Sequence, residues 1–569
     1  MTTRRIENAR PMDWWKSAVV YQIYPRSFAD SNGDGIGDLQ GVISKLDYLA
    51  ELGIDVVWLS PIYRSPQVDN GYDISDYQDI DPLFGTLDDV DELLEKAHAR
   101  GIKIVMDLVV NHTSDQHEWF IESRDPKSSK RDWYYWRPAR PGFEPGSPGA
   151  EPDDSGAAFA PSAWTYDPIS GEYYLGMFSP GQPDLNWENP EVREAVYEMM
   201  RWWVARGIDG FRMDVINLIS KPERLTSGRP LNPDDDEDRR QIANGPRLDE
   251  FLAEMNREVG LDDHNLLTVG EMPGATVAVA QSVTNPANRE LNMVFTFEHV
   301  NLDQSDPSKW SLADLPLPVL KENLRAWQDG LADAGWNSLY FTNHDQPRPV
   351  SRFGDDSPEH RVNSAKTLAT ALHMHKGTPY VYQGEEFGMT NVPLASIDQY
   401  QDVESLNYHR LATTSGVPEE QVMESLAAKS RDHARTPVQW DDSAHAGFTS
   451  GTPWFAVNPN YTTINAEAAR RDPGSVFAHY QKLIRLRHEH EVVREGRFAL
   501  LLPDHEQIWA FTRTSGDDTV LVLANCSPQP AEVPVADLPE HSDAELLLGT
   551  HDDADPATLA PWESRVLAL

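Results

Sequence analysis

The 569-residue sequence has a single cysteine, Cys526, so no disulfide bond can form within the chain. A protein without disulfides fits a reducing compartment. The first residues, MTTRRIENARPMDWW, include no apolar segment of the kind found in secretory signal peptides, and we therefore expect a cytoplasmic protein. No uninterrupted apolar run approaches the roughly 18 residues of a membrane span, so the sequence predicts no membrane partner.

Basic residues are also scarce, because 49 Lys and Arg stand against 91 Asp and Glu, which gives a formal net charge of −42. Nucleic acids and anionic lipids bind basic surfaces, so this balance argues against both as partners. Apolar residues make up 40% and charged residues 25% of the chain, a composition that can bury a large core. These features fit a small neutral substrate. They give no prediction of the oligomeric state.

Eight short apolar runs recur along the chain, and stretches with helical patterns, such as 87–100 and 193–206, usually follow them. Near-continuous apolar runs are typical of parallel strands that are covered on both faces. Eight strand–helix repeats predict an α/β fold, a (β/α)₈ TIM barrel. The expected strands lie at residues 19–25, 56–61, 103–110, 210–216, 266–271, 293–298, 338–345 and 378–386.

Two segments do not fit the repeat and predict additional domains. The connection after the third strand is too long for one helix and is rich in Pro, Gly, Trp and Tyr, so we expect a small inserted domain at 113–185. Short alternating strands from residue 495 predict a C-terminal antiparallel β-domain of the sandwich type at 495–569. The barrel then comprises 1–112 and 186–494, with a helical excursion at about 390–439.

Four of the expected strands contain an acid near their C-terminal end: Asp107, Asp214, Glu271 and Asp345. In a TIM barrel these strand ends converge on one face. An unpaired charge in an apolar run is costly to bury, and Asp107 taken alone is best interpreted as half of a structural ion pair. Three or more such acids from different strands indicate a shared purpose, and we expect a cavity lined by carboxylates.

Clustered carboxylates suit the cleavage of a glycosidic bond, which passes through an oxocarbenium-like state and requires a proton on the leaving oxygen. One acid must be ionised and another protonated, so their surroundings must differ. Arg212 lies two residues before Asp214, on the same side of the strand, and we expect its charge to keep Asp214 ionised. Glu271 has no cation nearby in the sequence and is the better candidate for the protonated acid.

Seven segments carry a family resemblance: DLVVNHTS (107–114), QPDLNW (182–187), GFRMDVIN (210–217), TVGEMPG (268–274), FTNHDQPR (341–348), QGEEFGM (383–389) and ARTPVQW (434–440). Together they resemble glycoside hydrolase family 13, the α-amylase family, and within it the oligo-1,6-glucosidase and α-glucosidase group. The resemblance implies a retaining, exo-acting α-glucosidase that acts on short oligosaccharides. A membrane-anchored relative without catalysis is disfavoured, because all three matching acids are present.

The resemblance also implies roles for individual residues. Asp214 matches the nucleophile that forms a β-glucosyl-enzyme, Glu271 the general acid/base, and Asp345 the third carboxylate, which holds sugar hydroxyls. The other implied substrate-binding residues fall into three groups. Arg212, His112 and His344 match residues that bind glucose in the cleavage subsite; Asp69, Tyr72 and Arg435 match the end wall of a closed pocket; and Phe159, Phe178 and Gln182 match pocket-lining residues of the inserted domain.

The prediction of the linkage preference depends on the residue that follows the expected nucleophile. Valine at position 215 resembles enzymes that cleave α-1,6 bonds, such as those of isomaltose, whereas Thr or Ala is more typical of α-1,4 enzymes. A maltase-type α-1,4 enzyme stays an alternative. A sucrose isomerase or glucosyltransferase is a second one, although such relatives typically carry an arginine-rich stretch where this chain reads EHVNLDQSD (298–306), without arginine.

A loop after the first expected strand, DSNGDGIGD (30–38), is a candidate metal site. Asp30, Asn32, Asp34 and Asp38 supply oxygen atoms at loop positions 1, 3, 5 and 9, and the carbonyl of Ile36 is available between them. Hard cations favour such ligands. The same residues also favour a plain turn, and position 12 is Gly41, which excludes an EF-hand. With the family resemblance, we expect a structural Ca²⁺ or Mg²⁺ here and no organic cofactor.

Overall fold

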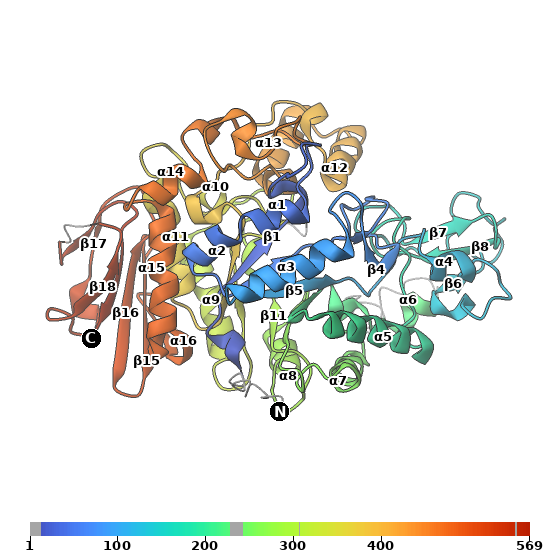
Figure 1. Ribbon diagram of the computed structural model, residues 1–569, viewed down its shortest axis with the longest axis horizontal. Coiled ribbons are helices and arrows are strands. Elements are labelled where there is room, and N and C mark those ends of the chain that lie inside the picture. The colour runs from blue at the N-terminus through green and yellow to red at the C-terminus, as the bar shows by residue number, and fades with distance from the viewer. Residues whose placement is uncertain (1–12, 228–242, 306–307, 552–554) are drawn as a thin grey trace, which may run out of the picture.

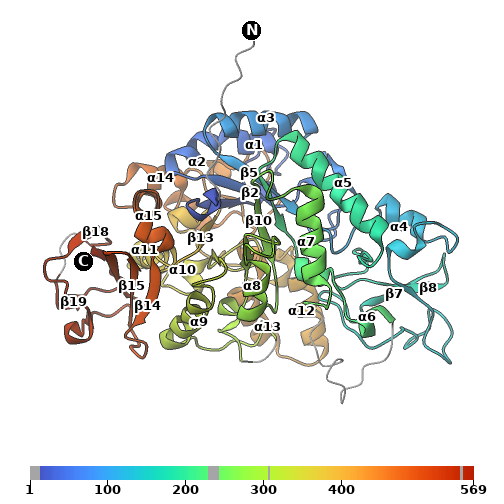
Figure 2. The ribbon, with the colours of Figure 1, turned by 90° about the horizontal axis from the view of Figure 1, so that it is seen from below.

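The computed structural model describes residues 13–227, 243–305, 308–551 and 555–569. Its long axis carries three parts (Figure 1): a central barrel, the segment with α4 (Glu118–Ser123) and β6 to β8 at one end, and the C-terminal sheet at the other. Figure 2, turned by 90°, shows the same two parts on opposite sides of the barrel. None of the helices in the described ranges is both long and apolar enough to cross a membrane.

Eight parallel strands form the barrel, in the order β11, β10, β9, β5, β2, β1, β13, β12. A parallel bridge between Val294 and Asn337 joins the first and last strands and closes the ring. The predicted TIM barrel is therefore confirmed. The strands are β1 (Val20–Ile23), β2 (Val56–Leu59), β5 (Lys103–Leu108), β9 (Gly210–Met213), β10 (Leu267–Glu271), β11 (Met293–Phe295), β12 (Ser338–Leu339) and β13 (Thr378–Tyr382).

Side chains alternate between the inside and the outside of the ring, which explains why the strands read as continuous apolar runs. Val56 and Trp58 of β2 belong to the cluster that fills the barrel, together with Val20 and Val105. Their neighbour Val57 belongs to the larger cluster under the surrounding helices. Those helices include α3 (Leu87–Ala99), α5 (Pro190–Arg206), α7 (Leu248–Val259), α8 (Val277–Val283), α9 (Leu317–Gly330), α11 (Arg361–His373) and α15 (Val476–Glu489).

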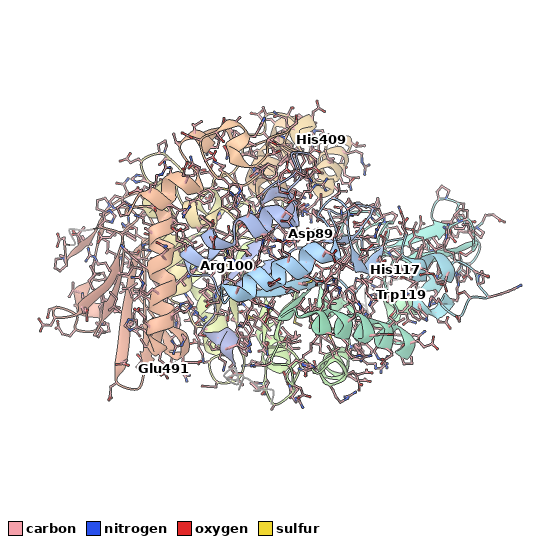
Figure 3. All side chains as sticks on the ribbon, viewed as in Figure 1. Asp89, Arg100, His117, Trp119, His409 and Glu491 are labelled. Atoms are coloured by element: carbon pink, nitrogen blue, oxygen red, sulfur yellow. The ribbon has the colours of Figure 1, made fainter. Side chains whose placement is uncertain are left out.

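Helix α3 illustrates how local sequence sets the element boundaries. The Thr86 hydroxyl accepts from the Asp89 N–H, and the Asp89 carboxylate accepts from the Thr86 N–H, so the two residues form a capping box at the helix start. Figure 3 labels Asp89 near the beginning of α3 and Arg100 just past its end. At that end Arg100 contacts Asp47, at 2.6 Å between Nε and Oδ1. A capped, amphipathic helix of this kind fits the predicted return over the sheet.

The segment 113–185 contains its own three-stranded sheet, with β6 (Trp136–Arg137), β7 (Trp164–Asp167) and β8 (Glu172–Leu175) in the order β6, β8, β7. Aromatic residues fill the space beside it; His117 and Trp119, both labelled in Figure 3, lie with their ring centroids 4.5 Å apart. An antiparallel bridge between His112 and Asp184 ties the two ends of the segment together at the barrel. The segment is thus anchored beside the third barrel strand of the chain, β5.

After the last barrel strand, α12 (Val403–Thr414) and α13 (Glu419–Lys429) form a helical excursion. The C-terminal region contains a five-stranded antiparallel sheet, in the order β14, β15, β16, β20, β18, and a second sheet of β17 and β19. The main sheet comprises β14 (Arg497–Leu501), β15 (Ile508–Ser515), β16 (Asp518–Asn525), β18 (Glu545–Gly549) and β20 (Ser564–Ala568); the second pairs Ala531–Glu532 with Thr558–Leu559. The domain boundaries given above stay predictions.

Candidate active site

Arg212, in β9, is the centre of a buried cluster of charges at the C-terminal end of the barrel. It is 1% exposed and contacts three carboxylates. Its Nη1 lies 2.9 Å from Asp107 Oδ1 and 2.7 Å from Asp214 Oδ1, and its Nη2 lies 2.7 Å from Glu271 Oε2. One guanidinium therefore holds acids from β5, β9 and β10 at one place. The predicted ion pair of Asp107 is confirmed, and Glu271 has a cation that its sequence neighbours did not indicate.

The backbone after Asp214 turns sharply, and this turn also serves Glu271. Val215 has φ 35° and ψ 41°, a left-handed conformation that a β-branched residue rarely adopts. In this conformation its N–H donates to Glu271 Oε2 at 3.1 Å. Gly210, at the start of the same strand, allows β9 to approach β10, because a Cβ there would lie 2.1 Å from the Leu267 carbonyl oxygen. Close strand packing and the turn together position both acids.

Asp345 lies on a loop, six residues beyond β12, and not at the end of a long strand as the apolar run indicated. Its N–H donates to Asn343 Oδ1 at 2.8 Å, which fixes the loop. Its Oδ1 accepts from Arg435 Nη2 at 2.8 Å and Arg431 Nη1 at 3.2 Å. Burial alone would raise the pKa of Asp345, but the neighbouring positive charges outweigh burial and hold it well below its usual range.

The neutral imidazole of His344 lies beside this carboxylate, with Nε2 3.4 Å from Asp345 Oδ2. Burial lowers the pKa of His344 to about 3, so at neutral pH the ring carries one proton. The Gln22 amide donates to Nδ1 at 2.8 Å, which leaves the proton on Nε2. Since His344 is uncharged, Arg431 and Arg435 supply the charge that keeps Asp345 ionised.

Asp69 and Gln182 form a polar wall between the inserted segment and the barrel. Gln182 Nε2 donates to Asp69 Oδ2 at 3.1 Å, and Arg431 Nη2 approaches Asp69 Oδ1 to 3.6 Å. Asp69 Oδ1 is buried and has no hydrogen-bond partner among the described residues. Burial raises the pKa of Asp69 to about 7, although Arg431 opposes this. An unsatisfied buried acceptor of this kind fits a hydrogen bond from a ligand.

Aromatic rings and a second histidine complete the wall. Tyr72 stacks on His344 at 5.2 Å between ring centroids, and its hydroxyl donates to Asp107 Oδ2 at 3.1 Å. His112 Nε2 lies 2.9 Å from the Tyr72 carbonyl oxygen, and its ring lies 5.0 Å from that of Phe178. Phe159 lies 6.0 Å from Phe178 and faces the Arg431 guanidinium at 5.0 Å. The structure thus brings all of the expected catalytic and substrate-binding residues into one connected cluster.

The two acids held by Arg212 titrate in a shared environment. Burial raises the pKa of Glu271 to about 8 and that of Asp214 to about 7, and Arg212 opposes both shifts. Burial therefore opposes the effect that we expected of Arg212, and the ionisation of Asp214 stays a prediction. The order of the two values still supports the expected division, since the last proton stays on Glu271 near neutral pH.

Sequence reasoning missed three members of this cluster. Arg431 lies four residues before Arg435, a proximity that could have drawn attention to it. Asp402, whose Oδ2 accepts from Arg435 Nη1 at 2.6 Å, carried no signal. Tyr24 follows β1 as the acids follow their strands; its ring stacks 6.4 Å from His344, and its buried hydroxyl has no partner among the described residues.

The candidate metal loop is ordered by its own side chains. Asp30 Oδ1 accepts from the N–H groups of Asn32 and Gly33, Asn32 Oδ1 from Asp34, and Asp34 Oδ1 from Ile36. Asp38 also has a second role, because its Oδ1 accepts from the Gly41 N–H and caps the start of α1 (Leu39–Ser44). In the described part of the chain, no three Asp, Glu, His or Cys side chains form a cluster that could hold a metal. The oxygen donors of Asp30, Asn32 and Asp34 nevertheless have the chemistry of a hard-cation site.

Comparison with known proteins decides the family. A family model of the alpha amylase catalytic domain matches residues 22–496, and one of the maltogenic amylase C-terminal domain matches residues 498–565. The chain belongs to the α-amylase family of glycoside hydrolases. The resemblance predicted from the motifs is thereby confirmed, and this α-amylase family member is an enzyme, a glycoside hydrolase.

Individual relatives match the family member over nearly its whole length. An oligo-1,6-glucosidase of Parageobacillus thermoglucosidasius is 55% identical over 567 residues, which are 98% of this chain and 99% of that protein. The crystal structure of a trehalose-6-phosphate hydrolase from Bacillus licheniformis is 49% identical, with a TM-score of 0.91, over 98% of this chain and 99% of that one. An isomaltulose synthase from a Klebsiella species is 39% identical, with a TM-score of 0.91 and the same two coverages.

Proposed function

We propose that this enzyme is a retaining, exo-acting α-glucosidase that releases terminal α-glucose from short oligosaccharides and prefers α-1,6 linkages. The observation that carries the proposal is the contact of Arg212 with both Asp214 and Glu271, at 2.7 Å each. A shared guanidinium fits the short separation of about 5–5.5 Å that retaining enzymes use, and not the wider gap of inverting ones. The likeness to oligo-1,6-glucosidases supports the same conclusion.

In this mechanism the Asp214 carboxylate attacks the anomeric carbon while Glu271 gives its proton to the departing oxygen. A covalent β-glucosyl-enzyme results, and Glu271, now a carboxylate, takes a proton from water as the water attacks. Because Glu271 Oε2 already accepts from Arg212 and from the Val215 N–H, Oε1 is the oxygen that carries the transferred proton. Retention of the α configuration follows from the two inversions.

The end wall supports recognition of a terminal glucose. Asp69 Oδ1 and the Tyr24 hydroxyl would hydrogen-bond sugar hydroxyls, since neither has a hydrogen-bond partner among the described residues. Asp345, kept anionic by Arg431 and Arg435, would accept from two hydroxyl groups and favour the distorted ring of the transition state. Tyr72, packed flat on His344, would support the apolar face of the sugar.

A substrate panel tests the linkage preference against the alternatives. Isomaltose, maltose, sucrose, trehalose and trehalose 6-phosphate are compared by rate and by product. We expect glucose from isomaltose at the highest rate. Preferred hydrolysis of maltose would make the enzyme a maltase, isomaltulose or trehalulose from sucrose would make it an isomerase, and preferred cleavage of trehalose 6-phosphate would match the relative of that name.

The nucleophile assignment is tested by chemical rescue. Asp214→Gly should fold and lose activity by several orders of magnitude, because no carboxylate is left to form the covalent intermediate. Added azide should restore turnover of an activated α-glucoside and give β-glucosyl azide, the product of a single inversion. Formation of the α product in this variant, or near-native activity without azide, would contradict the assignment.

We also propose that Asp30, Asn32 and Asp34, with the Ile36 carbonyl and Asp38, hold a structural Ca²⁺ or Mg²⁺ that stiffens the loop. The support is the oxygen-only donor set on one loop, which the side chains of Asp30, Asn32 and Asp34 order by accepting from its backbone N–H groups. Chelator should lower the melting temperature, and added Ca²⁺ or Mg²⁺ should restore it. An unchanged melting temperature, with no metal found by elemental analysis of the purified protein, would exclude the site.

We further propose a cytoplasmic location and a small oligosaccharide as the only substrate partner. The single cysteine and the acidic charge of −42 support this. Fractionation of the source cells with an antibody to the enzyme should recover it with cytoplasmic markers; recovery from the culture medium would contradict the proposal.

A further inference from the structure

A second hollow of the molecule lies between the barrel and the C-terminal sheet. It is a cleft of about 770 Å³ lined by the beginning of α9, by α10 (Pro349–Arg352), by the end of α13 and by residues of the C-terminal region. None of the catalytic or substrate-binding residues discussed above lines it. Helix α9 packs against β14, and Figure 2 shows α9 and α10 next to this sheet, on the side away from β7 and β8.

Two buried side chains with nitrogen atoms that can donate line this cleft, which we call the interdomain cleft. Trp509 lines it and is fully buried, yet its indole N–H has no partner among the described residues. Lys429 also lines it and is 5% exposed, and its ammonium is paired with the Asp303 carboxylate. Asp303 is shared with Arg352, at 2.7 Å from Nε to Oδ2. A buried donor without a partner costs stability unless a ligand or water satisfies it.

The interdomain cleft is also lined by acceptors. Asp314, Asp356 and Glu506 line it and are exposed. With Asp303 the lining carries four carboxylates against two cations, Arg352 and Lys429, a net charge of 2 − 4 = −2. This negative charge disfavours an anion. The donors in the lining disfavour a cation, which needs acceptors alone.

Hydroxyl groups suit a lining that contains both donors and acceptors, because each one can donate and accept. Leu315, Leu320 and Phe353 also line the cleft, and their apolar surface suits the C–H face of a pyranose ring. A volume of about 770 Å³ lies within the range of ligand pockets. We propose that the interdomain cleft is a second binding site for a neutral sugar of one or two rings, separate from the catalytic site.

This site is linked to the catalytic loops through short contacts. Arg352 donates to Gln346 Oε1 at 2.6 Å, and Gln346 follows Asp345 in the chain. Lys429 lies two residues before Arg431, which contacts Asp345. A sugar that binds Arg352 and Lys429 therefore touches both segments that position Asp345, and its binding changes the kinetics of hydrolysis as well as the occupancy of the cleft.

Equilibrium dialysis with radiolabelled glucose tests the proposal by counting sites. Ala427 lines the cleft from the exposed side of α13, so Ala427→Trp fills it; Glu420→Trp places the same side chain on the same helix, outside the cleft. We expect one fewer bound glucose per chain in Ala427→Trp than in the wild type and in Glu420→Trp. Unchanged stoichiometry in Ala427→Trp overturns the proposal, whatever the catalytic site binds.

A second variant covers the case in which Ala427→Trp fails to fold. Trp509→Phe keeps an aromatic side chain at this position and removes the indole N–H together with the five-membered ring. It should weaken the second binding event about fivefold, the loss of roughly one hydrogen bond, and leave the first unchanged. Equal affinity of both events in Trp509→Phe and in the wild type overturns the role of the cleft. The number of glucose molecules bound per chain can be compared between variants without any assay of activity. A difference of one bound glucose would therefore support the cleft site even if the enzyme proves not to be an α-glucosidase.

Discussion

At the scale of single residues, the charges next to each acid of the candidate site decide whether that acid is ionised or protonated. Asp345 has two arginines within 3.2 Å and stays ionised. Asp107, Asp214 and Glu271 share the single charge of Arg212, so one cation serves three carboxylates. Burial then decides the balance, and the proton that remains near neutral pH is held by Glu271. The same arrangement supplies an acid and a nucleophile from similar side chains.

This division predicts the pH dependence of catalysis. Activity requires Asp214 ionised and Glu271 protonated, so kcat/KM should fall as pH rises above about 8, when Glu271 loses its proton, and fall as pH drops below about 7, when Asp214 gains one. Glu271→Gln, assayed with p-nitrophenyl α-glucoside, should lose the alkaline limb, because that leaving group needs no acid. An alkaline limb that persists in Glu271→Gln would assign it to another group.

Arg431 supplies a second prediction at this scale. Its guanidinium contacts Asp69 at 3.6 Å and Asp345 at 3.2 Å, and removing it leaves one buried and one half-buried acid with less positive charge nearby. Arg431→Gln should reduce kcat/KM by about a hundredfold or more, the magnitude expected when a positioning charge is lost. Arg410→Gln, an exposed arginine on α12, is the matched control. Equal losses in the two variants would show a general effect of removing an arginine.

At the scale of elements, the sequence predicted the strands well and the loops poorly. Parallel strands buried on both faces leave a direct trace in the sequence, and all eight were located from apolar runs. The contacts of Arg431, Asp402 and Tyr24 depend on how distant loops fold over the barrel, and local patterns do not encode that. The motifs located Asp214 and Glu271. They could not predict that burial raises the pKa of Asp214 more than Arg212 lowers it, because burial depends on how distant segments pack around the site.

The turn between β9 and the helix that follows carries the prediction for linkage. Val215→Thr keeps the β-branched shape, so the left-handed turn and the N–H to Glu271 should persist. The ratio of the isomaltose to the maltose hydrolysis rate should fall about tenfold, which is the change in substrate selectivity that one small group in a pocket can produce. Val319→Thr, a valine that is 45% exposed on α9, controls for the substitution itself. An unchanged ratio would remove Val215 from the determinants of linkage.

At the scale of the whole molecule, one buried lysine ties the C-terminal sheet to the barrel. Lys321, on α9, is fully buried, and its ammonium donates to the carbonyl oxygens of Leu502, His505 and Ile508 at 2.7, 2.7 and 3.1 Å. All three acceptors lie in or just before β15. The same strand carries Trp509 of the interdomain cleft, so this contact fixes one wall of the cleft as well as the position of the sheet.

Lys321→Met should therefore destabilise the fold and spare the catalytic chemistry. It removes one donor from three carbonyl groups, of which that of Ile508 is buried, and this costs about 2–4 kcal/mol. The melting temperature should drop by several degrees, whereas kcat for isomaltose at 25 °C should stay within about twofold, because no catalytic contact includes Lys321. Lys482→Met, an exposed lysine on α15, is the matched control and should change neither. A wild-type melting temperature in Lys321→Met would show that the sheet is held by its apolar face alone.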